Sequence, residues 1–186
     1  MVTKERILIY VLRRDLRLAD NPIFHEISRL FGQSERPFTH LLPIYTFPAN
    51  QVEVSGFLSS PDAKSPYPEA RSQVGGFWRC GNLRAKFLAE SVWDTKRHLE
   101  RVGSGLGVRV GTIQDVVRSV LQDYKDKEDD VEVTGLWMTN EEGVEEKREE
   151  RDVKKLCQEF EVDYKPWVDE KYYIDEYVLT TIRILE

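Results

Sequence analysis

The 186-residue chain is poor in the side chains that build covalent or metal-based frameworks. It contains 2 cysteines, Cys80 and Cys157, and 3 histidines. Two cysteines can neither form a disulfide framework nor supply a cysteine-based zinc site by themselves. The histidines stand on separate predicted elements without companion ligands, so each is interpreted as a core or surface histidine. The sequence predicts neither a metal cofactor nor a disulfide-stabilised fold.

The chain also lacks a long apolar run and an excess of positive charge. No apolar segment approaches the roughly 20 residues that a membrane-spanning helix needs. Lys and Arg number 27 against 33 Asp and Glu, a formal net charge of −6, so phosphate binding would require a local basic patch. Residues 1–6 have the pattern of neither a secretory signal nor a transit peptide. We expect a soluble intracellular protein of unassigned compartment, with no membrane partner.

Several familiar catalytic and nucleotide-binding motifs are missing as well. The sequence has no Walker loop, no Gly-x-Ser-x-Gly elbow and no His-Glu-x-x-His. The glycine cluster at 103–107 runs from a predicted helix into a predicted strand, whereas a dinucleotide fingerprint needs its glycines between a strand and a helix. Classical NAD binding is therefore disfavoured.

What the chain does contain is a regular alternation of apolar patterns. Continuous apolar runs of strand length alternate with segments whose apolar residues recur at helical spacing. The predicted strands are 7–12, 38–47 (broken or ended near Pro43), 106–110, 131–138 and 162–167. The predicted helices run from a cap at Asp20 or Asn21 to Gly32, over 83–102 and 113–124, and onward from Thr139. This order predicts an α/β fold with a doubly wound, five-stranded parallel sheet, Rossmann-like in architecture.

Two segments depart from that pattern. Residues 48–81 are rich in proline and polar residues and include Gly75-Gly76, and a loop of this length indicates function or local disorder. Residues 169–186 carry aromatic residues but no matching partner element, and we interpret them as a truncated linker or irregular tail. The expected domain therefore covers 1–168.

Three arginines follow the first predicted strand. In doubly wound sheets ligands bind outside the carboxyl ends of the strands, where the strand order reverses. Arg13, Arg14 and Arg17 could form a solvated turn in which Asp15 pairs locally. Their guanidinium groups could equally hold carboxylates or phosphates of a ligand, or of a docking domain. The residues alone leave both interpretations open.

Asn140, Glu141 and Glu142 follow the fourth predicted strand. Thr139 and Glu142 have the spacing of a capping box, which would start the next helix and account for Glu142. An amide beside a carboxylate at a strand end could read a heterocycle such as a pterin or a purine. The rest of the charged stretch 141–155 is interpreted as a solvated helix face.

Several segments resemble the DNA photolyase/cryptochrome family. Residues 10–22, YVLRRDLRLADNP, are similar to the family's opening strand followed by Arg-Arg-Asp-Leu-Arg and Asp-Asn-Pro. Residues 84–94, with 109–111 downstream, are most similar to the cryptochrome DASH branch. Residues 136–142 and 164–167 stand where the family has its fourth and fifth strands, so the resemblance spans roughly 7–175.

The resemblance implies an N-terminal α/β antenna domain. In this family a larger helical domain binds FAD and, in photolyases, a pyrimidine dimer in DNA. That domain is not among these 186 residues. FAD, DNA contact and dimer repair are therefore expected only in the complete family architecture, and the chain alone is expected to be inactive. Arg13, Arg14 and Arg17 would face the helical domain.

The resemblance also implies an antenna cofactor and its contacts. In folate-type relatives methenyltetrahydrofolate harvests light for FAD, and an Asn-Glu pair after the fourth strand contacts the pterin. Asn140 and Glu141 occupy that place, with Glu142 as the alternative if the register shifts by one residue. Folate binding is expected to be weak without the second domain, because part of the ligand stays solvated.

Three classes of function remain open at this point. The first is a light-harvesting and docking module of a blue-light sensor or DNA-repair flavoprotein. The second is a truncated regulatory or protein-binding form, which binds neither folate nor flavin and pairs with a helical domain or a second copy of itself. The third is a light-independent enzyme with a nucleotide site at the sheet. A docking surface would leave exposed apolar residues.

Overall fold

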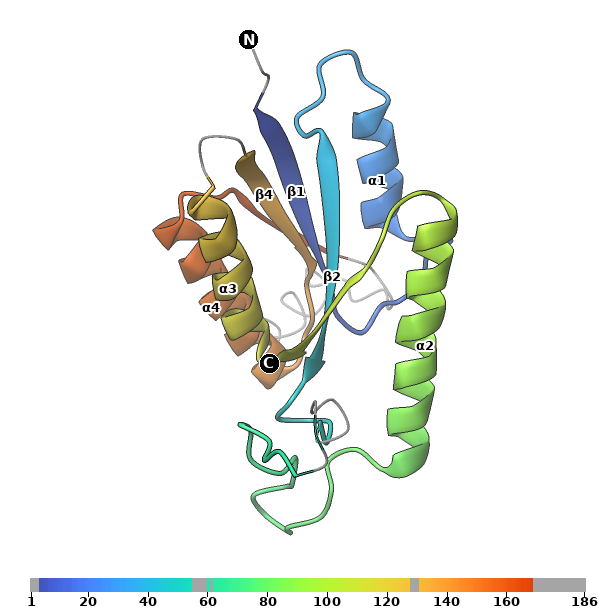
Figure 1. Cartoon of the computed structure of the whole chain (residues 1–186), viewed down its shortest axis with the longest axis vertical. Helices are drawn as coiled ribbons and strands as arrows, with labels where there is room; N and C mark the ends of the chain where they lie inside the picture. Colours follow the sequence, from blue (N-terminus) through green and yellow to red (C-terminus); the bar gives the residue numbers. More distant parts are fainter. Residues whose placement is uncertain (1–3, 55–59, 61, 128–130, 169–186) are drawn as a thin grey trace, which may run out of the picture.

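The computed structural model describes residues 4–54, 60, 62–127 and 131–168, in which strands and helices alternate (Figure 1). The strands are β1 (Glu5–Leu12), β2 (His40–Pro48), β3 (Gly107–Gly111), β4 (Val131–Thr139) and β5 (Tyr164–Trp167). The helices are α1 (Pro22–Phe31), α2 (Asn82–Arg101), α3 (Ile113–Lys125) and α4 (Val144–Glu159). The tail expected over 169–186 lies outside the described residues.

The strands form one parallel five-stranded sheet in the order β3-β2-β1-β4-β5. The chain proceeds outward from β1 through β2 to β3, and then crosses back to place β4 on the other side of β1. The predicted doubly wound sheet is confirmed. Its strand order reverses between β1 and β4, so the turns that follow these two strands border the expected ligand crevice.

Helices cover both faces of the sheet, with α1 and α2 on one side and α3 and α4 on the other (Figure 1). Alternate residues of β1 enter the two resulting cores. Ile7, Ile9 and Val11 pack toward α3 and α4. Leu8, Tyr10 and Leu12 pack in the other core, with residues of α1 and α2. Burial on both faces explains why β1 is a continuous apolar run rather than an alternating one.

The predicted start of α1 and the predicted end of α2 are confirmed. The Asn21 side chain caps α1, since its Oδ1 accepts from the backbone N–H groups of Ile23 and Phe24 at 3.0 Å. At the end of α2, Gly103 adopts a left-handed φ of +78°. The next N–H, of Ser104, donates to the Leu99 carbonyl at 2.9 Å. This is the Schellman ending that favours glycine.

Two local predictions are wrong. Thr139 does not cap α4: it is the last residue of β4, aligned with Trp167, and α4 begins only at Val144 after Gly143. Strand pairing holds Thr139 in the sheet, so the capping-box spacing is not used. Nor does β2 break at Pro43, which lies inside the strand. Because β3 pairs with β2 only from Ile44 onward, β2 is still an edge on that side at Pro43, where a missing N–H is tolerated.

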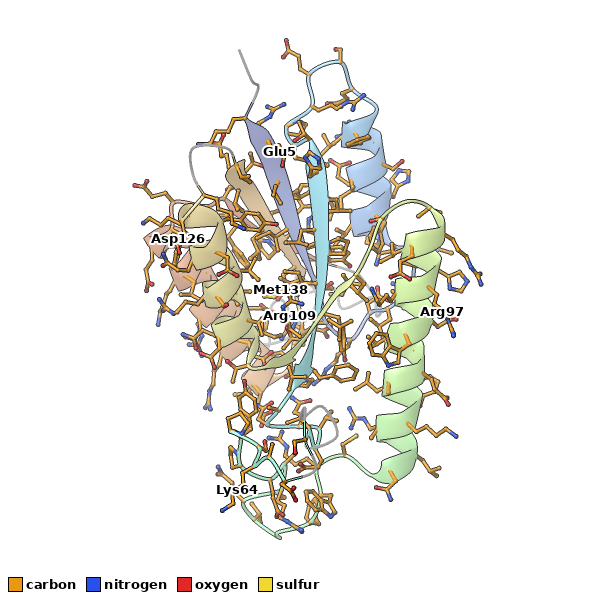
Figure 2. All side chains as sticks on the ribbon, in the orientation of Figure 1. Glu5, Lys64, Arg97, Arg109, Asp126 and Met138 are labelled. Atoms are coloured by element: carbon orange, nitrogen blue, oxygen red, sulfur yellow. The ribbon has the colours of Figure 1, made fainter. Side chains whose placement is uncertain are left out.

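The predicted long loop lies beyond the carboxyl end of β2. Figure 2 shows Lys64 of this loop at the opposite end of the molecule from Glu5, which begins β1. The described residues of the loop contain no helix, but they include a tight turn in which Arg71 and Trp78 pair. The Arg71 guanidinium stacks 3.8 Å from the centre of the Trp78 ring. This turn lies beyond the carboxyl end of β2 (Figure 1), the edge at which ligands are expected.

Candidate functional site at the strand-order reversal

Arg13 connects the turn after β1 to α4. Its side chain is only 3 % exposed. Nη1 donates to the Thr139 carbonyl at 3.2 Å and to Glu150 Oε1 at 2.8 Å. Nη2 donates to Glu149 Oε2 at 2.8 Å and to the Glu146 carbonyl at 3.3 Å. The guanidinium therefore lies between β1 and β4 at the carboxyl edge, where the strand order reverses.

This arrangement meets the electrostatic requirements of a buried cation. Removing a charge from water is costly unless close opposite charges and hydrogen bonds replace the lost hydration. Arg13 has two carboxylates and two carbonyls as acceptors. Its charge is therefore balanced inside the domain, and the docking of Arg13, Arg14 and Arg17 against a helical domain stays a prediction.

Arg14 and Arg17 lie on the surface. The Arg14 side chain is 56 % exposed and pairs with the Glu146 carboxylate. The Arg17 side chain is 46 % exposed and donates from Nε and Nη2 to the two oxygens of Asp15, both at 2.8 Å. The local pairing of Asp15 is confirmed. Both arginines have exposed surface for docking, which remains a prediction.

The turn after β4 is held from two sides. The Asn140 N–H donates to the Trp167 carbonyl of β5 at 2.7 Å. The Glu141 N–H donates to Glu150 Oε1 of α4 at 2.8 Å. The residues Asn140 and Glu141 are half-buried, whereas Glu142 is exposed and pairs with Lys147 at 3.0 Å. Asn140 and Glu141 are therefore more enclosed than Glu142.

One side of α4 carries acidic residues whose burial the sequence pattern does not reveal. The charged pattern over 141–155 indicates a solvated helix face, but Glu146 is buried and Glu150 is 12 % exposed. Glu146, Glu149 and Glu150 lie three and four positions apart, and so on one side of the helix. That spacing, opposite three arginines at a strand end, is the signal that could have identified the cluster.

Tyr164 lies beside this cluster. Its hydroxyl is buried and has no hydrogen-bond partner among the described residues. Burial, reinforced by the negative charge of Glu150, raises the pKa of Tyr164 to about 12. The phenol therefore stays protonated at neutral pH and offers the site no additional negative charge.

Four exposed apolar side chains belong to the loop before α2 and to the first turns of α2, which begins beyond the carboxyl end of β2 in Figure 1. Leu83 is 87 % exposed and Phe87 is 70 % exposed, and they lie four residues apart on one helix face. Val74 and Phe77 of the preceding loop are 98 % and 65 % exposed. We call Val74, Phe77, Leu83 and Phe87 the apolar surface. Exposed apolar residues are expected where another domain or chain docks, and docking here stays a prediction.

Neither a metal-binding cluster nor a membrane-spanning helix is found among the described residues. They contain no group of three or more His, Cys, Asp or Glu side chains that could hold a metal ion. None of their helices is long and apolar enough to cross a membrane.

Comparison with known proteins places the chain in a family. The family model for DNA photolyase matches residues 8–169. A Neurospora crassa protein named as a mitochondrial cryptochrome DASH is 48 % identical over 171 residues, which is 92 % of this chain and 22 % of that protein. The chain spans about a quarter of the length of the curated relatives it matches.

Solved structures share the fold. A Synechocystis cryptochrome aligns with a TM-score of 0.67 and 20 % identity, over 90 % of this chain and 28 % of that one. A Sulfolobus tokodaii photolyase, described with two FAD molecules and a novel light-harvesting cofactor, aligns with a TM-score of 0.58 and 15 % identity, over 95 % of this chain and 34 % of that one. With its five-stranded parallel sheet and a family match over 8–169, this chain belongs to the DNA photolyase family and corresponds to the family's N-terminal α/β domain.

Proposed function

We propose that this chain is the antenna-chromophore and docking domain of a blue-light flavoprotein of the cryptochrome DASH or photolyase type, and is not catalytic by itself. The observation that carries the proposal is the position of Asn140 and Glu141. Both are half-buried in the turn after β4, beside the point where the strand order reverses. Ligands of doubly wound sheets bind at this point.

The side chains fit the edge of a pterin. An amino-pyrimidinone edge presents parallel N–H donors that a carboxylate can accept, and Glu141 Oε1, which is buried, would have to turn toward the ligand to accept one of them. The Asn140 amide can donate and accept beside it. Methenyltetrahydrofolate is therefore the proposed ligand, with Glu142 as the alternative contact; when bound, it would supply light absorption for transfer to a flavin. FAD itself is proposed only for a longer protein that includes the family's helical domain.

The docking part of the proposal rests on exposed groups. The apolar surface and the side chains of Arg14 and Arg17 provide apolar contact and positive charge. Because relatives are about four times longer than this chain, the proposed partner is the FAD-binding helical domain. DNA would be contacted only through that domain.

Titration of the purified chain with methenyltetrahydrofolate, followed by absorption and fluorescence, tests the antenna role. We expect saturable binding by the wild type and a roughly tenfold or greater loss in Glu141→Gln, which replaces an acceptor oxygen with a donor. Glu142→Gln is the matched variant: it should bind like the wild type if Glu141 is the contact, and should lose affinity in place of Glu141→Gln if Glu142 is the contact. Equal binding by all three proteins removes the site assignment. Parallel titration with FAD distinguishes a folate from a flavin chromophore.

The apolar surface also supports a second candidate, a regulatory form that binds neither folate nor flavin. Such a form would use the apolar surface for a helical domain or for a second copy of this chain. It predicts self-association in sedimentation experiments together with no chromophore binding. Saturable folate binding that depends on Glu141 would argue against it.

A further inference from the structure

We propose that Glu150 is a positioning residue, which transmits the fixed position of Arg13 to the turn that carries Asn140 and Glu141. The inference rests on the proposed function for its ligand. Its basis is a shared acceptor: Glu150 Oε1 accepts from Arg13 Nη1 and from the Glu141 N–H, each at 2.8 Å. One carboxylate oxygen thus joins the turn after β1 to the turn after β4.

The Arg13 guanidinium, at one end of this connection, is held by several hydrogen bonds. The guanidinium is planar and 3 % exposed, and its two terminal nitrogens have acceptors on β4 and α4. Its forked geometry permits few alternative positions once these bonds are made. Glu150 is held on this fixed group and is itself 12 % exposed.

The hydrogen bond from the Glu141 N–H to Glu150 holds the turn after β4 against α4. The preceding N–H, of Asn140, is held by the main chain of β5. The Glu141 N–H donates to a side chain instead. A substitution at Glu150 can therefore remove this hydrogen bond while the backbone hydrogen bonds of the sheet stay in place. Once released, the Glu141 carboxylate would sample more positions, and a ligand would have to restrict them on binding.

Glu149 provides a matched control. It pairs with the other terminal nitrogen of Arg13, also at 2.8 Å. Among the described residues, its bonds include none to the 140–142 turn, whereas Glu150 bonds to the Glu141 N–H. Both carboxylates stabilise buried Arg13, but only Glu150 contacts the turn. The two roles of Glu150 can therefore be separated.

The test combines amide hydrogen exchange at Glu141, measured by NMR, with methenyltetrahydrofolate titration. We expect Glu150→Ala to accelerate exchange at the Glu141 amide about tenfold or more and to weaken folate binding. Glu149→Ala should leave both within about twofold, although it also lowers the melting temperature. Glu150→Gln should retain protection, because its amide oxygen can still accept the Glu141 N–H.

Equal effects of the two alanine variants on Glu141 exchange would overturn the proposal, since Glu150 would then act only through stability. If Glu150→Ala does not fold, Glu150→Leu and Glu149→Leu serve for the same comparison under conditions where both are folded. A wild type that binds no folate, but whose Glu141 amide responds to Glu150 alone, rejects the proposed function and supports the positioning role. Folate binding that is unaffected by Glu150→Ala while the amide is released rejects the coupling.

Discussion

The Arg13 guanidinium donates to the Glu149 carboxylate at 2.8 Å and thereby joins the end of β1 to α4 across the point where the strand order reverses. The two residues are 136 positions apart in the sequence. The pair is largely buried, with side-chain exposures of 3 % and 25 %. The first turn of the photolyase motif thus has a structural role inside this domain.

Replacing Arg13 should destabilise the fold strongly. Arg13→Gln leaves Glu149 and Glu150 without their cation, and breaking a buried pair on one side typically costs about 3–5 kcal/mol. Because both carboxylates retain some solvent contact, we expect about 3 kcal/mol, measured by urea unfolding. Arg118→Gln is the control and should cost less than about 1 kcal/mol, since the side chains of Arg118 and its partner Glu159 are 49 % and 54 % exposed. Similar losses for the two variants would contradict the assigned role of Arg13.

Gly103 should tolerate no side chain without loss of stability. Its φ of +78° lies in the left-handed region. Gly103→Ala should therefore lower the free energy of unfolding by about 1–2 kcal/mol. Gly105→Ala provides the comparison, because a Cβ there meets nothing within 4 Å and its φ is not in the strained range. Thermal melting of both variants measures the difference, and equal melting temperatures would show that the Schellman ending adds no stability.

Stability should fall in alkaline solution. Burial raises the pKa of Cys157 and of Tyr164 to about 12, above their ordinary values of roughly 9 and 10. The unfolded chain therefore loses these protons first, so the free energy of unfolding should decrease from about pH 9 to about pH 12. Urea unfolding across this range measures the slope. No decrease above pH 9 would contradict the raised pKa values.

Tyr164→Phe should weaken this alkaline decrease. It removes one of the titrating groups, together with a buried hydroxyl that has no hydrogen-bond partner among the described residues. At pH 7 the variant should be as stable as the wild type or more stable by up to about 1 kcal/mol. A clear loss of stability at pH 7 would indicate that the hydroxyl is satisfied in solution.

Phe87→Ser should affect association and leave stability unchanged. The side chain is 70 % exposed, so the free energy of unfolding should change by less than about 0.5 kcal/mol. If the apolar surface mediates association, sedimentation should show weaker self-association or weaker binding of a helical domain supplied separately. Val92→Ser, on the same helix but fully buried, should instead cost about 2 kcal/mol or more.

The elements of the fold were predictable because their signals are local. A strand buried on both faces has to be continuously apolar, as β1 is, and a capping side chain can mark the start of a helix, as Asn21 does for α1. The placement of Asn140 and Glu141 after β4 follows from the same reasoning, because a parallel sheet carries its ligand residues at the carboxyl ends of its strands. The residues' identity as pterin contacts remains a proposal.

By itself, the sequence determined the order of strands and helices, the family motif after β1 and the edge of the sheet where a ligand would bind. Only the tertiary structure decided which charges meet there. Thr139 could have capped a helix, but its pairing with Trp167 keeps it in β4. Glu150 could have been solvated, but the packing of α4 brings it to Arg13. Such partners depend on how separate elements pack, and residues more than 100 positions apart leave no periodic signal in the sequence.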